Sequence, residues 1–139
     1  MNAQESLSRL KEGNDRFVHA KPTTVVQGNS AREALTGGQA PYAIILSCAD
    51  SRVAPEQAFD TGLGEIFIIR VAGNVANTSS IASIEYAVAN LGTKLIVVMG
   101  HQSCGAVGAA IAGGDAGPNL NKLVSYITPS VEKLGSDAP

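Results

Sequence analysis

The chain of 139 residues carries ten lysine and arginine side chains against twelve aspartate and glutamate side chains, a formal net charge of −2, and 45% of its residues are hydrophobic. This balance is typical of one globular domain and argues against a disordered chain. Charges of one sign do not form long runs, which argues against binding to nucleic acid or a membrane surface through bulk charge. Apolar stretches fall short of the roughly 18 residues that a membrane span needs, and we expect a cytoplasmic protein.

The N-terminal segment predicts an amphipathic helix over residues 3–19, because its apolar residues fall near one face of a helical period. These residues are Leu7, Leu10, Phe17 and Val18. The helix is expected to end before Pro22, and its apolar face needs a partner surface in its own domain or in another subunit. A polar stretch follows, with a short helix expected near Ala31 to Leu35.

Three apolar segments further along the chain predict β-strands, at residues 42–47, 65–71 and 94–100. The first segment shows no polar alternation, which is typical of a parallel sheet covered on both faces. Helices are expected between and after the strands, at residues 55–60, 79–91, 104–114 and 119–134. This alternation predicts an α/β fold with a parallel sheet core and flanking helices.

Single residues also predict where one of these helices begins and where another is interrupted. Thr78 or Ser79 is expected to cap the helix at 79–91, because a side-chain oxygen there can accept a bond from a free backbone amide. Pro129 is expected to kink or split the helix at 119–134, because proline removes a hydrogen bond from the helix interior.

The two cysteines, Cys48 and Cys104, leave three interpretations open: buried structural thiols, one disulfide bridge, or part of a metal site. Cys48 follows the first expected strand and His101 follows the third, so both loops lie at the same pole of a parallel sheet. Cys104 stands close after His101, at the start of the next helix. Two sulfurs and one imidazole nitrogen suit zinc in tetrahedral geometry with the fourth position open. The sequence therefore predicts a metal centre at this pole.

Asp50 and Arg52 stand beside the first of these ligands. Asp50 has two possible roles, as a metal ligand itself or as the acceptor of a proton from a metal-bound water. Arg52 can hold the carboxylate by a forked pair of hydrogen bonds. If Arg52 holds Asp50, the fourth ligand is water; if Arg52 releases it, Asp50 closes the site.

The segments “CADSR” and “GHQSCG” resemble the Cys-x-Asp-Ser-Arg and His-x-x-Cys-Gly motifs of β-class carbonic anhydrases. The likeness extends from “GQAPYAIILSCADSRVAP” through “GEIFIIRVAGN” and “SIEYAV” to “IVVMGHQSCGAV”. It implies a zinc enzyme, with one Zn²⁺ per chain, that hydrates CO2 reversibly to bicarbonate and a proton through a zinc-bound hydroxide. It also implies a parallel sheet, a dimer as the basic unit, and an N-terminal helix that packs on a partner subunit.

At the metal, the resemblance assigns Cys48, His101 and Cys104 as ligands and Asp50 with Arg52 as the dyad beside the metal-bound hydroxide, with Asp50 as the alternative fourth ligand.

A substrate pocket is implied by the same resemblance. Gln39 matches a glutamine that, in plant-like members, points into the active site from across the dimer interface. Phe67 and Tyr86 match aromatic pocket residues, and Gly105 follows the last ligand as the motif requires. An apolar wall suits CO2, and an amide donor can orient bicarbonate. The chain has no Trp, which argues against the bacterial branch with a Trp-containing regulatory bicarbonate site.

We expect one β-carbonic-anhydrase-like domain over residues 1–139, with a helical arm at 1–22 and an α/β core at 40–135. Family members usually continue past the point where this chain stops, so it is either a natural short form or a partial product. Two alternative functions stay open: a carbon disulfide or carbonyl sulfide hydrolase on the same scaffold, and a zinc-stabilised assembly protein without catalysis. The expected partners are CO2 or bicarbonate and further copies of the chain, as a homodimer or higher homo-oligomer, without nucleic acid or membrane.

Overall fold

A three-stranded parallel sheet forms the centre of the protein in the computed structural model, which describes residues 1–24 and 27–135. The strands are β1 (Ala43–Ser47), β2 (Ile66–Arg70) and β3 (Ile96–Met99), in the spatial order β2-β1-β3. Each of the three lies within a segment that the sequence predicts as a strand. The α/β fold with a parallel sheet is therefore confirmed.

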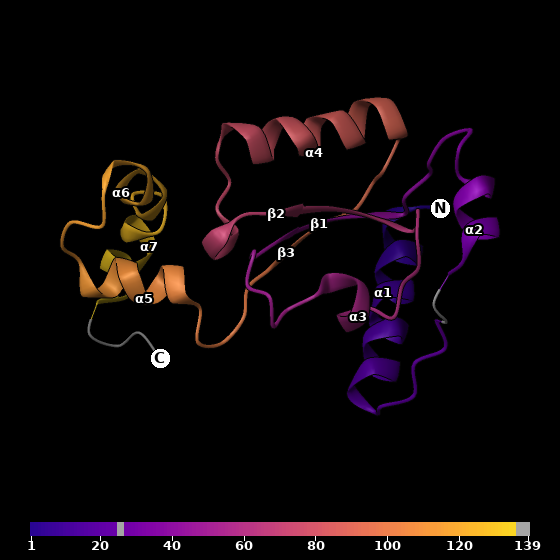
Figure 1. Ribbon diagram of the computed structural model, residues 1–139, viewed down its shortest axis with the longest axis horizontal. Helices are drawn as coiled ribbons and strands as arrows, with labels where there is room; N and C mark the ends of the chain where they lie inside the picture. The colour runs from indigo at the N-terminus through magenta and orange to yellow at the C-terminus, as the bar shows by residue number, and fades with distance from the viewer. Residues whose placement is uncertain (25–26, 136–139) are drawn as a thin grey trace.

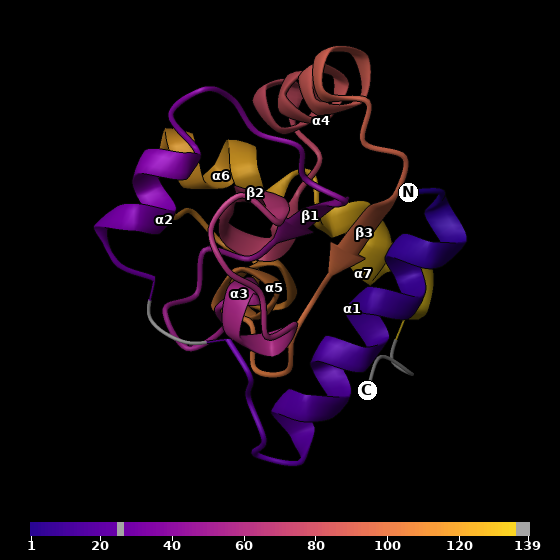
Figure 2. The same cartoon turned by 90° about the vertical axis from the view of Figure 1, so that its right-hand side faces the viewer.

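Helices flank the sheet on both faces and gather beyond one of its ends. They are α1 (Ala3–Val18), α2 (Asn29–Ala34), α3 (Pro55–Ala58), the 3-10 helix η1 (Ala72–Asn74), α4 (Thr78–Leu91), α5 (Gly105–Ala112), α6 (Pro118–Val124) and α7 (Thr128–Leu134). Figure 1 shows α4 on one face of the sheet, α1 and α3 on the other, and α5, α6 and α7 grouped beyond the carboxyl ends of the strands. Figure 2, viewed along the strands, shows α1 beside β3. Among the described helices, none combines the length and the apolar character that a membrane crossing demands.

The central strand β1 is buried along its whole length, and its alternate side chains enter two different core clusters. Ala43 and Ile45 pack with Leu10 of α1, whereas Ile44 and Leu46 pack with residues that include Ala87 of α4. Because helices cover both faces, each side chain of the strand meets an apolar layer. This explains why its sequence shows no polar alternation.

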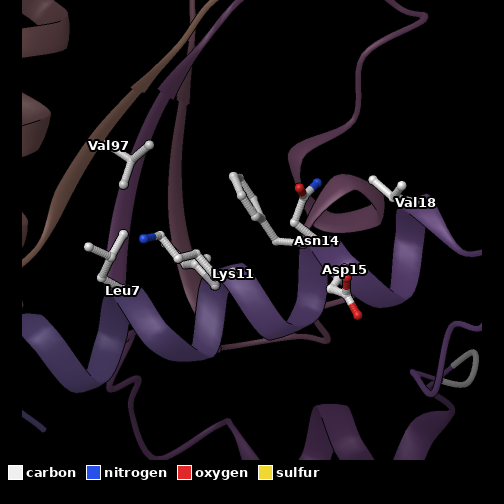
Figure 3. A pocket seen from close by; sticks show the side chains of 8 residues that line it. Leu7, Lys11, Asn14, Asp15, Val18 and Val97 are labelled. Atoms are coloured by element: carbon white, nitrogen blue, oxygen red, sulfur yellow. The ribbon is translucent and has the colours of Figure 1, made fainter.

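Helix α1 packs closely on its own chain. Asn2 and Glu5 form a capping box at its start, and Leu10 is only 2% exposed. A Cβ added at Gly13 would lie 1.9 Å from the carbonyl oxygen of Phe59, so only glycine allows α1 to approach α3 this closely. A pocket of about 260 Å³ lies between α1 and β3, where Leu7 and Val97 line it (Figure 3). Packing of α1 on a partner subunit stays a prediction.

A buried carboxylate fixes the chain that follows α1. Asp60, just after α3, accepts hydrogen bonds from the Arg16 guanidinium, from the amide and hydroxyl of Thr23, and from the amide of Thr24. The Asp60 side chain is 2% exposed. Hydrogen bonds from the Thr23 amide, and to a lesser extent from Arg16, hold the pKa of this carboxyl well below its usual range. Asp60 therefore ties α1, α3 and residues 23–24 together as a charged group.

The expected cap of α4 is wrong by one residue. Asn77 caps this helix, and its side-chain oxygen accepts a hydrogen bond of 2.9 Å from the Ser80 amide. Asn caps a helix by the same chemistry as Thr or Ser, so three neighbouring residues of the sequence could each have been the cap. The expected effect of Pro129 is confirmed, because the segment divides into α6 and α7 and Pro129 lies in the first turn of α7.

Candidate metal centre

The loops that follow β1 and β3 begin side by side. Ser47, the last residue of β1, pairs with Met99, the last residue of β3. Cys48 follows directly after β1, and His101 follows β3 after a single glycine. The parallel register therefore brings Cys48 and His101 to one pole of the sheet, as their positions in the sequence predict.

A tight turn then returns the chain toward the same point. Ser103 has a φ of +55°, in the left-handed region that residues other than glycine rarely adopt. Cys104 follows as the N-cap residue of α5, and Gly105 is the first residue of that helix. Because of this turn, the side chains of Cys104 and His101 approach the same position although only two residues separate them.

Three potential ligand atoms converge at this pole. One ligand atom from each of Cys48, His101 and Cys104 lies within 4.8 Å of the other two. The sulfur atoms of Cys48 and Cys104 are 3.9 Å apart, close to the separation of about 3.8 Å that tetrahedral zinc requires with Zn–S bonds of about 2.3 Å. Both thiols are free and buried. A disulfide, with its S–S bond of about 2.05 Å, is not formed.

The imidazole of His101 is oriented for metal binding. Its Nδ1 lies 2.8 Å from the carbonyl oxygen of Gln102, which places the ring proton on Nδ1. Its Nε2 is buried and has no hydrogen-bond partner within the described part of the chain. A buried nitrogen with a free lone pair, facing two thiols, is the arrangement that a metal ion completes. These residues therefore fit zinc.

Local electrostatics favour the thiolate form of Cys48. Burial acts to raise the pKa of the thiol, but the neighbouring His101 imidazole and the backbone at Asp50 and Gly73 outweigh it and lower the pKa to about 7. The pKa of His101 is raised, chiefly by the neighbouring thiol of Cys48. Metal binding requires a deprotonated thiol, so this environment lowers the cost of preparing the ligand.

Asp50 pairs with Arg52 in this structure. The Nε and Nη2 of Arg52 donate to Oδ1 and Oδ2 of Asp50 at 2.9 and 2.7 Å, and the Arg52 amide donates to Oδ1 at 2.9 Å. These bonds, above all those from the guanidinium, hold the pKa of Asp50 well below its usual range. Asp50 Oδ2 still lies 3.9 Å from Nε2 of His101. In this structure Arg52 therefore holds the Asp50 carboxylate, and the role of Asp50 at the metal stays a prediction.

Three of the four residues expected in the substrate pocket lie away from this pole within one chain, whereas Gly105 directly follows Cys104. Gln39 is exposed and precedes β1, at the opposite end of that strand from Cys48. Phe67 pairs with Ile44, three residues before the end of β2, which is about 10 Å along the strand. Tyr86 of α4 is half exposed, and its ring centre lies 6.3 Å from that of Phe67. Their role as pocket residues stays a prediction.

Two further contacts to Cys48 come from residues that the sequence analysis did not single out. Arg70, at the end of β2, donates to the carbonyl oxygen of Cys48 at 2.8 Å. The amide of Gly73 donates to the sulfur of Cys48 at 3.3 Å. A charged residue at the end of the apolar segment “IFII” was the available signal for Arg70. A backbone amide leaves no comparable signal for Gly73.

Comparison with known proteins gives one family. Residues 43–139 match the family model described as “Carbonic anhydrase”. The chain is 49% identical over 126 residues to carbonic anhydrase 2 of Mycobacterium tuberculosis (strain ATCC 25618 / H37Rv), and the match covers 88% of this chain and 61% of that protein. It is 47% identical over 126 residues to the carbonic anhydrase of Mycolicibacterium smegmatis, with the same coverage. The chain thus spans about three fifths of the length of these relatives.

Solved structures of β-carbonic anhydrases are similar in fold to this chain. The β-carbonic anhydrase of Coccomyxa, in complex with acetazolamide, matches with a TM-score of 0.72 and 30% identity over 94% of this chain and 60% of that one. One of the structures of two tetrameric β-carbonic anhydrases from Sordaria macrospora matches with a TM-score of 0.73 and 26% identity, over 96% of this chain and 68% of that one.

Proposed function

Because this chain belongs to the carbonic anhydrase family, in its β class, we propose that it catalyses the reversible hydration of CO2 to bicarbonate and a proton at one zinc ion. The ligands would be Cys48, His101 and Cys104. The observation that carries the proposal is the convergence of these three ligand atoms, in which Nε2 of His101, without a hydrogen-bond partner among the described residues, faces two buried sulfurs. An aspartate held by an arginine lies beside them.

Zinc, when bound, supplies a Lewis acid that lowers the pKa of a water molecule at its open fourth position, so that a nucleophile forms near neutral pH. The protein's own contribution comes from Asp50. Because Arg52 holds its pKa low, the carboxylate stays unprotonated and can accept the hydrogen bond of the nucleophile. By accepting that bond, Asp50 would orient the nucleophile toward the carbon of CO2 and reduce the entropic cost of reaching the reactive geometry.

Arg52 has two functions in this proposal. Its forked contact engages both carboxylate oxygens of Asp50, which would keep the carboxylate from serving as a further metal ligand. A further bond of 3.2 Å from its Nη2 to the carbonyl of Ser103 links the dyad to the turn that carries Cys104. The same arginine therefore connects the two ligand loops.

A homo-oligomer completes the site in this proposal. Gln39, Phe67 and Tyr86 lie too far from the ligands of their own chain to wall its substrate pocket, so a neighbouring subunit would supply them. The Sordaria enzymes are tetrameric, which supports assembly in general. The cytoplasmic location expected from the sequence stays a prediction. The hydrolase and assembly-protein alternatives are not favoured, because the relatives reported above are carbonic anhydrases.

The test combines metal analysis with stopped-flow CO2 hydration. Cys48→Ser, His101→Ala and Cys104→Ser should each lose zinc and activity. Asp50→Asn should retain one zinc per chain and lose at least about 100-fold in turnover, because it removes an acceptor and not a ligand. Acetazolamide, which the Coccomyxa enzyme binds, should inhibit the wild type.

Two results would contradict the proposal. Full zinc content in any one of the three ligand variants would remove that residue from the ligand set. Normal zinc content in the wild type without CO2 hydration at any pH would favour the assembly protein over the enzyme.

A further inference from the structure

Arg70 connects β2 to the loop that carries Cys48. Its guanidinium donates to three backbone carbonyl oxygens, those of Cys48 at 2.8 Å, Asp50 at 2.7 Å and Val53 at 3.0 Å. Arginine presents several donors in a rigid plane, which suits it to contact three carbonyl oxygens at once. Arg70 therefore fixes the backbone of residues 48–53 from the neighbouring strand.

Gly73 contacts the same cysteine at its other end. Its amide donates to the Cys48 sulfur at 3.3 Å, and its φ is +69°, in the region that favours glycine. A Cβ at this position would lie 2.6 Å from Cδ1 of Ile127 and 3.2 Å from Cβ of Ala106. The backbone conformation therefore favours glycine here, and an added Cβ would also force Ile127 and Ala106 to shift.

We propose that the segment from Arg70 to Gly73 is a positioning element of the metal centre, which holds Cys48 by its carbonyl oxygen and by its sulfur together. This rests on the proposed function only in taking Cys48 as a metal ligand. The Arg70 contact sets where the sulfur stands, since it fixes the backbone that carries it. The Gly73 amide withdraws electron density from the sulfur and limits its rotation, as partners of metal ligands do in other proteins.

The test measures metal binding directly. The variants are Arg70→Met, Arg70→Lys and Gly73→Ala. Zinc affinity is measured by competition with a chromophoric chelator, and the sulfur-to-metal charge-transfer band is recorded after substitution with Co²⁺. Arg70→Met and Gly73→Ala should each weaken zinc binding by about 10- to 100-fold, the usual effect of losing such a partner. Arg70→Lys should fall between Arg70→Met and the wild type, because one ammonium replaces part of the contact.

The charge-transfer band separates the two contacts. Alanine keeps the amide, but relief of the positive φ and of the contact with Ile127 should move that amide away from the sulfur. Gly73→Ala should then shift the band to lower energy, because the sulfur loses a hydrogen bond that stabilised its electrons. Arg70→Met should move the band less, since Arg70 touches the carbonyl and not the sulfur. A general loss of stability would not produce this difference between the variants.

Matched controls exist elsewhere in the chain. Gly92 has a φ of +68°, and a Cβ there meets nothing within 4 Å. Gly92→Ala therefore imposes the same backbone strain without touching the metal centre. Arg32→Met removes an arginine from the distant helix α2. Both controls should bind zinc and cobalt as the wild type does.

Three outcomes would overturn the inference. Zinc affinity within twofold of the wild type in both Arg70→Met and Gly73→Ala would do so, and so would an equal loss in the Gly92→Ala control. Failure of the wild type to bind zinc or cobalt would remove this inference and the proposed function together. A wild type that binds zinc without hydrating CO2 would remove only the function, because the readout here is the metal. If Gly73→Ala does not fold, Arg70→Met and Arg70→Lys decide the matter.

Discussion

Leu10→Ala tests how α1 is attached to the rest of the protein. The Leu10 side chain is 2% exposed and packs with Tyr42, Ala43 and Ile45. Replacing a buried leucine by alanine costs about 2 to 5 kcal/mol, the sum of lost burial and the cavity left behind. Leu10 also lines the pocket of about 260 Å³ beside α1, so water or small shifts of the helix can fill part of the new space. We therefore expect a loss in the lower half of that range, about 3 kcal/mol.

Urea unfolding of the metal-loaded protein measures this loss, and for a chain of this size it corresponds to a decrease of about 12 °C in the melting temperature. Val18→Ala is the matched control, because Val18 lines the same pocket from the same helix but is 66% exposed. It should change the free energy of unfolding by less than about 0.5 kcal/mol. Equal effects of the two substitutions would refute the docking of α1 on its own sheet. A loss that depends on protein concentration would instead place Leu10 against a partner subunit.

Three further predictions concern charge, metal and helix capping. The low pKa of Asp60 stabilises the folded state above the unfolded carboxyl pKa of about 4, and this contribution is lost as the pH falls through the lower folded value. The free energy of unfolding of Asp60→Asn should therefore depend less on pH below about 4 than that of the wild type. Parallel pH curves for the two proteins would contradict this. Zinc at about 100 times its dissociation constant should raise the free energy of unfolding of the wild type by about 2.7 kcal/mol and leave that of Cys48→Ser unchanged. Thermal melts with and without chelator will check this. An equal response of both proteins would argue against Cys48 as a ligand. Asn77→Ala should destabilise the protein by about 1 kcal/mol through the loss of the α4 cap, with Thr78→Ala as the smaller effect in chemical denaturation, and the reverse order would return the cap to Thr78.

The sequence predicted those parts of the fold and the site that depend on local pattern. The buried run at Ala43–Ser47 identified a strand covered on both faces, and the positions of Cys48 and His101 after two parallel strands were enough to bring them together. Parallel register carries this information, because strands that run the same way end at the same pole. The placement of Cys48 and His101 therefore follows from topology, whereas Cys104 reaches them through the turn at Ser103.

Features that depend on side-chain direction or backbone amides were beyond the sequence. The choice of Asp50 between metal and Arg52 depends on rotamers, as does the reach of Arg70 to three carbonyl oxygens. The Gly73 contact depends on a backbone conformation that many glycines could adopt. The cap at Asn77 was missed because several neighbouring residues carry equivalent oxygens.

The separation of Gln39 from Cys48, at opposite ends of one strand, has a genetic consequence under the proposed assembly. A subunit with Cys48→Ser and a subunit with Gln39→Ala are each defective in the homodimer, but in a hybrid the two intact halves meet at one of the two sites. Refolding the two inactive proteins together at equal concentration should therefore recover about a quarter of the wild-type turnover, since hybrids form about half of a random mixture. Such complementation between two mutant alleles would mean that each active site needs residues from two chains.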